Sequence, residues 1–537
     1  MTASSTLVVG LDIGTTFSGA SWAQHEDGPS QREPTFHFID SWPHKSGVAK
    51  VPTQIAFDTD TLQPNTTVAW GYAYLRDAKQ FLINTEAGSG VNLMSQYLKV
   101  FWSHVMSSIT QALGPDVVKS SHMKIVMTIP AIWPPYAVDR MSTAAKEAGI
   151  AIQNNSSLTF MTEPEAAALC NFQGDRRFMQ QELAVDDNFV VCDAGGGTAD
   201  LITYRVVQCS DSLLALEEVV PGKGGLCGAA FLDEAFEELL LEHFGSGWRS
   251  AQVYERRGVM EDAWERRIKP DFDGDDTLTH LNVLVPSSCQ YYTRTSDRQK
   301  KLSDMLCASY EFTNDEIASV FEPIVTEITR LILEQIKGVV LRTSKKPKYI
   351  IMSGGFGQSK CLVQKVKAML ATESTDSVLL GMNSSSWSAV SRGAVLQGLA
   401  GSLRPSQAVH VRSRVSRGSY CTLQYETCDG NIHDQRDKRW SDEEGGYVGD
   451  DQTVWFLKYG DLINEGYSKR FEFYSMHPVS KGVPSSHTVS FFHCRDTEVP
   501  DRLGDTVKEL CSIEWSDPTR SVPETFENGL GDDFYAV

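Results

Sequence analysis

Two distant segments of the sequence each combine an aspartate with a glycine-rich turn. Asp12 precedes the first turn and Asp193 precedes the second. The turn residues are Gly14, Thr15 and Thr16 in the first segment and Gly195, Gly196, Gly197 and Thr198 in the second. Because glycine lacks a Cβ, the backbone amides of such turns can approach one anion closely. Carboxylates suit a Mg²⁺ ion that bridges the phosphates of a nucleotide. The pair therefore predicts two hairpins that hold one Mg-nucleotide, and two tight structural turns are the alternative.

Apolar runs surround both turns, at residues 6–22 and 188–206, and predict two similar strand-turn-strand units. Such a repeat is typical of a duplicated α/β core whose halves face each other across a cleft, where ligands bind preferentially. The other predicted elements of this core are strands at residues 124–130, 158–162 and 349–352 and helices at residues 134–149, 228–244, 313–342, 359–370 and 388–400, with one more helix from residue 163.

The sequence pattern changes after about residue 401, where helical periodicity fades and alternating runs occur at residues 470–476 and 487–494. We therefore predict three parts: a nucleotide-binding lobe I at residues 1–187 with an inserted subdomain at about 40–120, a lobe II at 188–400 whose last helix returns toward the core, and a β-rich module at 401–537. Within this module we predict an exposed loop at residues 436–451 and a mobile tail from Pro518.

Charge and cysteine content limit the classes of partner and compartment. The chain has 537 residues with 69 acidic and 49 basic side chains, and the formal net charge of −20 repels nucleic acid and anionic membrane surfaces. No run of apolar residues approaches the roughly 18 that a membrane-spanning helix needs. The 11 cysteines are dispersed without a C-x-x-C pair, which indicates free thiols in a reducing compartment, the cytoplasm or also the nucleus.

The two hairpins resemble the phosphate-1 and phosphate-2 motifs of the actin, sugar-kinase and heat-shock protein 70 superfamily. Further stretches are similar to heat-shock protein 70 motifs: residues 127–131 (MTIPA) to the connecting segment, 162–168 (TEPEAAA) to the Asn-Glu-Pro-x-Ala-Ala-Ala motif, 224–228 (GGLCG) to a phosphate-touching stretch, and 353–359 (SGGFGQS) to the adenosine motif. The Gly-Gly-Phe form of the last motif is most similar to the atypical member-twelve subfamily, which is abundant in fungi. The resemblance covers about residues 6–400 and implies an α/β fold, a two-lobed actin-like ATPase domain of duplicated ribonuclease-H-like design with a β-rich C-terminal extension.

The resemblance implies a role for individual residues. Mg²⁺ would be supported through water by Asp12, Asp193 and Asp200. The β- and γ-phosphates would be held by Thr15, Thr16, Gly195, Gly196, Gly197 and Thr198, with Gly14 in the first turn and Gly228 approaching from the second lobe. The ribose and adenine would lie against Gly354, Gly355 and Phe356, with Lys269 or Arg267 stacked on the adenine.

Two further residues match family positions that act on the nucleotide cycle. Glu163 would position the attacking water and complete a catalytic set with Asp12, Asp193 and Thr198. The alternative for Glu163 is an acid stabilised by the dipole of the helix that it begins. Pro130 matches the proline that relays the nucleotide state, although a proline is also an ordinary strand terminator.

The sequence departs from the family pattern at three places. Lys99 is the candidate for the lysine that reaches the phosphates from lobe I, and a solvated helix lysine is its alternative. Residues 387–390 (WSAV) replace an Asp-Glu-Ala-Val pattern, so the adenine contacts there differ. The C-terminal part lacks the acidic-leucine linker and the helical lid of typical chaperones, so the resemblance does not extend to peptide gripping.

These features predict a protein that binds ATP and ADP with Mg²⁺, hydrolyses ATP slowly and closes its lobes around the nucleotide. The resemblance implies an atypical heat-shock protein 70-like chaperone or regulatory ATPase, with client or regulatory proteins as partners and with no nucleic-acid or membrane partner. Two alternatives are a nucleotide-gated scaffold without turnover and a small-molecule kinase of the same superfamily. The kinase is disfavoured because the sequence has no second sugar-kinase signature.

Overall fold

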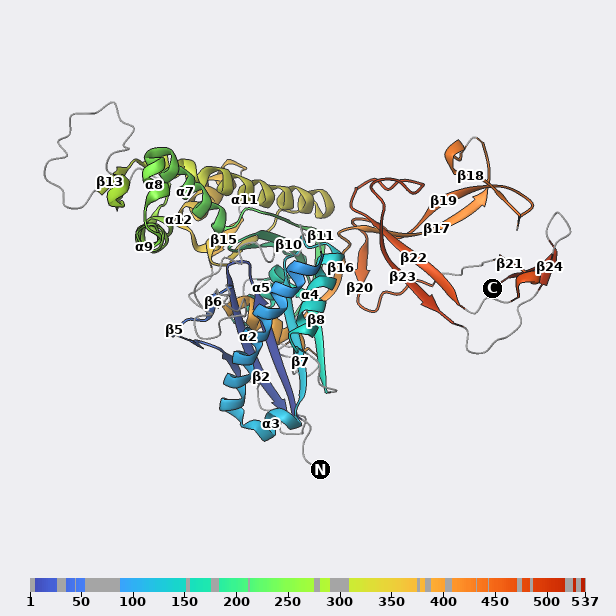
Figure 1. The fold of residues 1–537 in the computed structure, drawn as a ribbon, viewed down its shortest axis with the longest axis horizontal. Coiled ribbons are helices and arrows are strands. Elements are labelled where there is room, and N and C mark those ends of the chain that lie inside the picture. The colour runs from blue at the N-terminus through green and yellow to red at the C-terminus, as the bar shows by residue number, and fades with distance from the viewer. Residues whose placement is uncertain are drawn as a thin grey trace. The chain divides into compact units, whose positions relative to one another are not determined.

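A computed structural model describes most of the chain. The described residues are 5–26, 35–43, 45–53, 87–150, 155–174, 183–210, 213–274, 281–289, 309–373, 377–381, 388–400, 408–430, 432–442, 444–470, 476–482, 486–516, 525–527 and 533–536. The chain divides into two compact units, Met1–Val411 and Arg412–Val537. The predicted α/β fold with a β-rich C-terminal extension is confirmed (Figure 1).

The first unit contains two large sheets with the same strand arrangement, which confirms the predicted duplication. The strands of the first sheet are, in spatial order, β3 (Phe36–Phe38), β2 (Phe17–Glu26), β1 (Ser5–Ile13), β7 (His122–Ile129) and β8 (Ser156–Thr162), with β6 (Lys50–Pro52) also paired to β2. The corresponding strands of the second sheet, in the same order, are β11 (Leu213–Gly225), β10 (Ala199–Cys209), β9 (Asn188–Ala194), β14 (Tyr349–Ser353) and β15 (Val378–Gly381). In each sheet the strand that carries the aspartate pairs antiparallel with the next strand and parallel with a later one.

Helices surround the two sheets, and the six predicted helices are present together with others that the sequence did not predict. The helices of the first unit are α2 (Ala87–Leu113), α3 (Pro115–Ser120), α4 (Pro135–Glu147), α5 (Glu163–Gly174), α7 (Ala229–Phe244), α8 (Ser246–Ser250), α9 (Val253–Gly258), the π-helix η2 (Val259–Ile268), α10 (Lys269–Asp271), α11 (Asn314–Thr343), α12 (Lys360–Thr372) and α13 (Ala389–Gly398). Thr313 and Glu316 form the predicted capping box at the start of α11. The smaller elements are β4 (Ser41–Trp42), β5 (Lys45–Ser46), β12 (Leu281–Leu284), η3 (Ser287–Cys289), β13 (Ser309–Phe312) and η4 (Phe356–Gln358).

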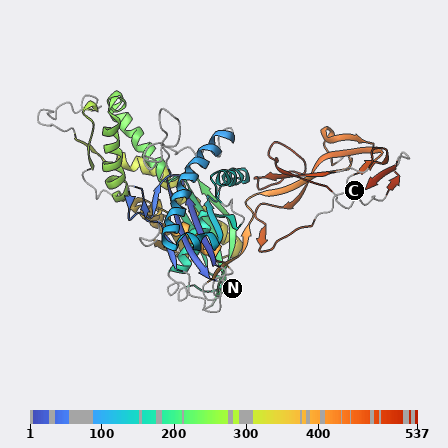
Figure 2. The same cartoon turned by 60° about the horizontal axis from the view of Figure 1, so that its bottom comes forward.

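Alternate side chains of the central strands enter different cores, as the period of two in a strand requires. On β9, Val190 and Cys192 pack with the helices α7, α11 and α12, whereas Phe189 and Val191 pack with α5 and α13. On β1, Leu7 belongs to the core beneath α2 and α4. These helices therefore cover the outer faces of the sheets, while α5 and α13 are shared between the sheets (Figure 1; Figure 2).

Very small residues allow α13 to pack closely on its neighbours. A Cβ at Gly393 would lie 1.8 Å from the carbonyl oxygen of Ala166 on α5, and a Cβ at Gly10 would lie 2.1 Å from that of Ser391 on α13. The hydroxyls of Ser21 and Ser391 are 2.8 Å apart and are both buried. The alanine run of the TEPEAAA stretch is therefore explained by the close approach of α5 to α13.

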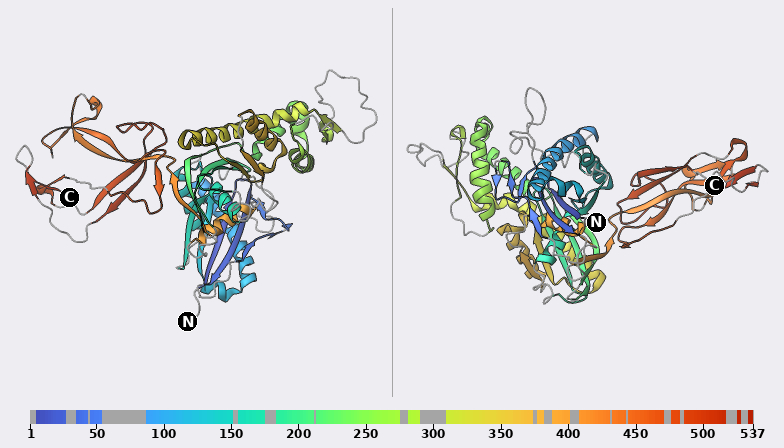
Figure 3. Two further views of the ribbon diagram at one scale, coloured as in Figure 1. Left: turned by 180° about the vertical axis from the view of Figure 1, so that it is seen from behind. Right: turned by 90° about the horizontal axis from the view of Figure 1, so that it is seen from below.

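The second unit consists of strands and short 3₁₀ turns in its described residues (Figure 3). Its five-stranded sheet has the order β18 (Lys438–Ser441), β19 (Gly446–Leu457), β17 (Ser419–Thr427), β22 (His487–Cys494) and β23 (Lys508–Trp515). Its other strands are β20 (Leu462–Asn464), β21 (Met476–Pro478), β24 (Thr525–Glu527) and β25 (Asp533–Ala536), and its 3₁₀ turns are η7 (Gln435–Asp437) and η8 (Val479–Lys481), while β16 (Ala408–Val415) spans the division between the units. The strand predicted at residues 487–494 is confirmed as β22, and most of the alternating run at 470–476 lies outside the described residues.

The prediction of an exposed loop at residues 436–451 is wrong. These residues form most of a hairpin, in which β18 pairs antiparallel with β19. Arg439 forms an ion pair of 2.7 Å with Asp450 across the hairpin, and the rings of Trp440 and Tyr447 meet edge to face. Cross-strand pairs of opposite charge and of aromatic rings stabilise a sheet even where the composition is acidic. In the tail predicted as mobile, β24 and β25 form a small sheet with β21, and its other residues lie outside the described part.

Two further sequence expectations concern membrane spans and cysteines. Within the described ranges, no helix is both long enough and apolar enough to cross a membrane. Ten of the cysteines lie in these ranges, and all ten are free thiols.

Replacing Gly393 with alanine should destabilise the first unit. The new Cβ would collide with a backbone oxygen, which can only move with its helix, and we expect a loss of about 3 kcal/mol of unfolding free energy. The matched control is Gly258→Ala, because a Cβ there meets no atom within 4 Å and the residue has α-helical angles. This control should keep its stability or gain up to about 1 kcal/mol. Urea unfolding followed by circular dichroism measures both, and equal midpoints would contradict the packing argument.

Candidate nucleotide-binding site

The two glycine-rich turns have the same hydrogen-bond pattern. The amide of Gly14 donates to the carbonyl of Phe17 at 3.1 Å, and the amide of Gly195 donates to that of Thr198 at 2.9 Å. Asp12 is the second-to-last residue of β1, and Asp193 is the second-to-last residue of β9. The carboxylates of both are buried. The duplicated topology therefore places equivalent turns and equivalent aspartates in the two halves.

The two turns lie directly against each other. A Cβ at Gly196 would lie 1.9 Å from the hydroxyl oxygen of Thr16, and a Cβ at Gly197 would lie 2.6 Å from that of Thr15. Any larger residue at these two positions would therefore collide with a threonine from the other half. The structure brings together the turn residues that the sequence predicts as one phosphate site.

The start of α7 fixes the second turn by hydrogen bonds. The first amides of a helix have no partner within the helix. Here the amides of Gly228, Ala229 and Ala230 donate to three turn carbonyls, those of Gly197, Gly195 and Gly196, at 3.3, 3.1 and 2.7 Å. A Cβ at Gly228 would lie 2.4 Å from the carbonyl carbon of Gly196, so glycine is required for this approach.

These bonds leave other turn amides available to a ligand. In the described part of the chain, the amides of four turn residues donate to no backbone carbonyl. These residues are Thr15, Thr16, Gly196 and Gly197. Successive amides of a glycine-rich turn can form an anion-binding site. The two turns can therefore donate hydrogen bonds to the phosphates of one nucleotide.

The predicted adenosine motif approaches the same site through its backbone. Gly354 has φ = +78°, and a Cβ there would lie 2.3 Å from the carbonyl oxygen of Ala194 and 2.6 Å from Oδ1 of Asp193. Gly355 precedes the short helix η4. The ring of Phe356 is only 4% exposed and packs in the core beneath α7 and α11, so in this structure it serves packing and not the cleft.

Several carboxylates lie close enough to influence one another at the site. The pKa of Asp193 is raised to about 8, mainly by burial and by the negative charge of Glu163, against the lowering effect of Lys50. Asp12 and Asp200 also raise this pKa. Asp200 is fully buried, and its Oδ1 accepts a hydrogen bond of 3.3 Å from the amide of Ile132, two residues after Pro130.

A magnesium ion fits these oxygen ligands. Among the described residues, no three His, Cys, Asp or Glu side chains lie close enough together to hold a metal ion directly. Mg²⁺ prefers hard oxygen ligands and usually keeps several of its waters. The buried carboxylates of Asp12, Asp193 and Asp200 would therefore hold the ion through water, and its charge would relieve their mutual repulsion.

Sequence reasoning missed a partly buried lysine at this site. Lys50, on β6, places its Nζ 2.5 Å from Oδ2 of Asp12. Burial by itself would lower the pKa of Lys50, but the charges of Asp12, Asp193 and Glu163 outweigh this effect and raise it. The candidate Lys99 is instead exposed on α2, as its alternative interpretation predicted. The three-residue strand β6 has too short a pattern to reveal that Lys50 faces Asp12.

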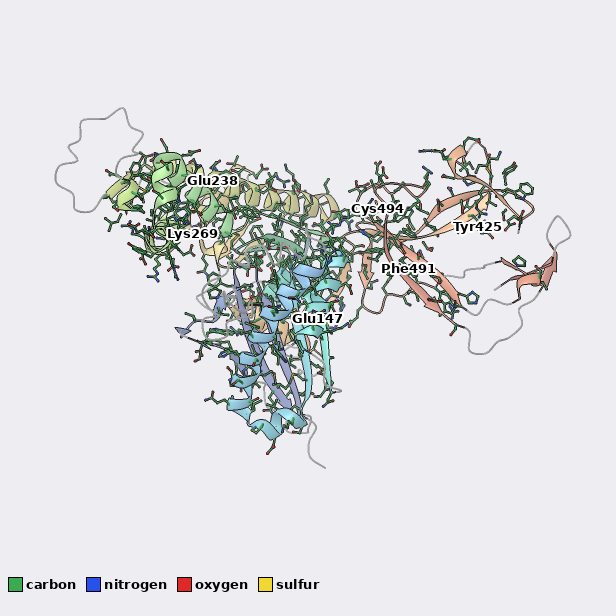
Figure 4. The ribbon with its side chains drawn as sticks, in the orientation of Figure 1. Glu147, Glu238, Lys269, Tyr425, Phe491 and Cys494 are labelled. Atoms are coloured by element: carbon green, nitrogen blue, oxygen red, sulfur yellow. The ribbon has the colours of Figure 1, made fainter. Side chains whose placement is uncertain are left out.

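The two basic candidates for adenine stacking pair within the second half. Nζ of Lys269 lies 2.7 Å from Asp233 on α7 and 2.8 Å from Glu265 on η2, among the green helices of Figure 4. The guanidinium of Arg267 donates to the backbone carbonyl of Asn282. Each cation therefore has a protein partner. Trp387, which belongs to the departing WSAV stretch, lies outside the described residues.

Comparisons with known proteins support the heat-shock protein 70-like family. No protein-family model matches the chain. Human heat shock 70 kDa protein 12B is 25% identical over 466 residues, which cover 68% of this chain and 65% of that protein. Human heat shock 70 kDa protein 12A is 24% identical, with coverage of 67% and 65%, and mouse heat shock 70 kDa protein 12A has the same identity and coverage. The matched region thus spans slightly less than two thirds of each relative.

Replacing Asp193 with asparagine should stabilise the metal-free protein at high pH. A carboxyl group whose pKa is raised on folding binds its proton more tightly in the folded state, so stability falls as the pH rises from about 4 to about 8. The substitution removes this loss, and we expect a gain of about 2 kcal/mol at pH 8 that vanishes near pH 4.

The control for this experiment is Asp262→Asn on η2, because the Asp262 side chain is 67% exposed. It should change stability by less than about 0.5 kcal/mol at either pH. Urea unfolding in the presence of a chelator measures the three proteins. If Asp193→Asn lost the same stability at pH 4 and at pH 8, folding would not raise the pKa of the Asp193 carboxyl group, and the prediction would be wrong.

Proposed function

We propose that this chain binds Mg·ATP and Mg·ADP between its two glycine-rich turns and slowly hydrolyses ATP. The observation that carries the proposal is the contact between the turns of the two halves, with Thr16 against Gly196 and an aspartate behind each turn. A pair of purely structural turns would require neither glycine at the point where the halves meet nor a cluster of buried acidic groups beside it. The distant similarity to heat shock 70 kDa proteins 12A and 12B supports the same conclusion.

The residues of the site have different roles in the transfer of a phosphate to water. The free turn amides bind and orient the phosphates, and preorganised donors of this kind stabilise charge that develops on them. Mg²⁺, when bound through Asp12 and Asp193, supplies further neutralisation of phosphate charge. Glu163 begins α5, and its effect on the pKa of Asp193 supports a position near the site, where a carboxylate can orient the attacking water.

Because the donors come from both halves, a bound nucleotide favours the arrangement in which both turns contact it. Loss of the γ-phosphate removes some of these contacts and relaxes that arrangement. We propose that client or regulatory proteins respond to this change, in a chaperone or regulatory role of the atypical member-twelve type. A cytoplasmic or nuclear location agrees with the free cysteines.

One observation favours a second function, a nucleotide-gated scaffold without turnover. The lysine candidate Lys99 is exposed on α2, and the partly buried Lys50 is already paired with Asp12. If no cation reaches the transferred phosphate, binding persists while hydrolysis is lost. The scaffold and the ATPase therefore differ in turnover and not in affinity.

Single-turnover hydrolysis of Mg·ATP by the full chain tests the proposal. Glu163→Gln should slow hydrolysis about 100-fold while nucleotide affinity changes little, because the substitution removes a base and retains its shape. Asp193→Ala should abolish both hydrolysis and tight Mg·ATP binding. The control is Glu147→Gln, since Glu147 is exposed at the end of α4 (Figure 4). It should behave as the unmodified protein.

The three possible results for the unmodified protein separate the functions. Slow hydrolysis supports the ATPase. Tight nucleotide binding without phosphate release supports the scaffold. No binding of Mg·ATP would overturn both.

A further inference from the structure

Lys50 is the cation that the structure places among the carboxylates of the site. Its Nζ lies 2.5 Å from Oδ2 of Asp12, and the two side chains are 19% and 3% exposed. The charges of Asp193 and Glu163 also act on it. One ammonium is therefore paired with Asp12 and lies within the electrostatic influence of two further acidic groups, at a place that water reaches only in part and where unpaired charge is costly.

Hydrogen bonds hold the backbone around Lys50 to the first phosphate turn. The amide of Thr53 donates to the carbonyl of Thr16 at 2.8 Å, and its hydroxyl donates to the carbonyl of Gly14 at 2.7 Å. On β2, Gly19 pairs with Lys50, and a Cβ at Gly19 would lie 3.0 Å from Cγ of the lysine. The missing side chain of Gly19 therefore leaves the space through which the lysine stem reaches Asp12.

This arrangement limits what can change when a ligand binds. The backbone of Lys50 is tied to the turn, so only its flexible side chain can exchange one partner for another. A free Mg²⁺ ion at Asp12 would either displace the ammonium from its carboxylate or lie close to a like charge. A nucleotide brings its own negative phosphates, and a lysine ammonium is a compact charge that pairs well with them.

We propose that Lys50 is the counter-ion of the metal site in the absence of ligand. Its ammonium excludes free Mg²⁺, and the ion binds only together with a nucleotide, whose phosphates then pair with the ammonium in place of Asp12. The proposal rests on the proposed nucleotide function for its second step. Its first step, the exclusion of free Mg²⁺, depends only on the pair of Lys50 and Asp12. Lys50 thereby sets the specificity of the site for a metal–nucleotide complex over the metal alone.

Binding of Mg²⁺ alone, without nucleotide, tests the first step. The probe is MgCl₂ titrated into the full chain, followed by calorimetry and by the shift of the melting temperature. Lys50→Met should bind Mg²⁺ at least about tenfold more tightly than the unmodified protein. The control Lys99→Met, which removes an exposed lysine of the same half, should bind as the unmodified protein. Lys50→Arg, which keeps the charge, should also exclude the ion.

Binding of Mg·ATP to the same proteins tests the second step. Lys50→Met should bind Mg·ATP about tenfold or more weakly, because the phosphates lose a charged partner. If the unmodified protein does not bind Mg·ATP, the proposed function fails, and the comparison with Mg²⁺ alone still decides the role of Lys50. If Lys50→Met binds Mg²⁺ no more tightly than the unmodified protein, the counter-ion proposal is overturned even where Mg·ATP binds.

Chemical labelling of the unmodified protein gives a result that does not depend on the folding of a variant. The rate of Lys50 acetylation, measured by mass spectrometry, should not change with Mg²⁺ alone and should change with Mg·ATP. Faster labelling of Lys50 in Mg²⁺ alone would show that the free ion displaces the ammonium and would overturn the proposal.

Discussion

The site depends on keeping several carboxylates together where little water can screen them. Asp12 and Asp193 are almost fully buried, and Glu163 adds its charge from the start of α5. Isolated buried charges are unfavourable, so the arrangement persists only with a compensating cation. Lys50 supplies one positive charge that lowers the pKa of Asp193, but burial and the neighbouring carboxylates raise this pKa by more. The fold thus retains a cluster of acidic groups whose repulsion a bound divalent cation would relieve.

The positions of the two aspartates follow from the duplication, which the sequence shows directly. Each belongs to an apolar strand followed by a glycine turn, and such a pattern can be recognised from local composition alone. The same holds for Gly228 and Gly354, whose spacing along the chain matches known motifs. In the structure, a Cβ at Gly228 would lie 2.4 Å from a backbone atom and a Cβ at Gly354 would lie 2.3 Å from one, so both positions require glycine. Local patterns thus predicted the turns and the strands that hold them.

Other features could not be predicted because they depend on partners that are distant in the chain. Lys50 belongs to a short strand whose pairing with β2 decides which carboxylate it meets. Phe356 follows two glycines of a ligand motif, yet its ring packs in the core beneath α7. The acidic stretch at residues 436–451 forms a hairpin because Arg439 meets Asp450 across it. Composition gives no information about such pairs.

The helices between the two sheets connect the site to the relative position of the halves. Glu163 is the first residue of α5, and the same helix packs against α13 so closely that Gly393 tolerates no Cβ. Close packing transmits displacement because packed elements cannot be compressed. A displacement of one sheet against the other would therefore involve α5 and Glu163 at its start. The helix that carries Glu163 and the strands that carry the two turns are consequently parts of one packed arrangement.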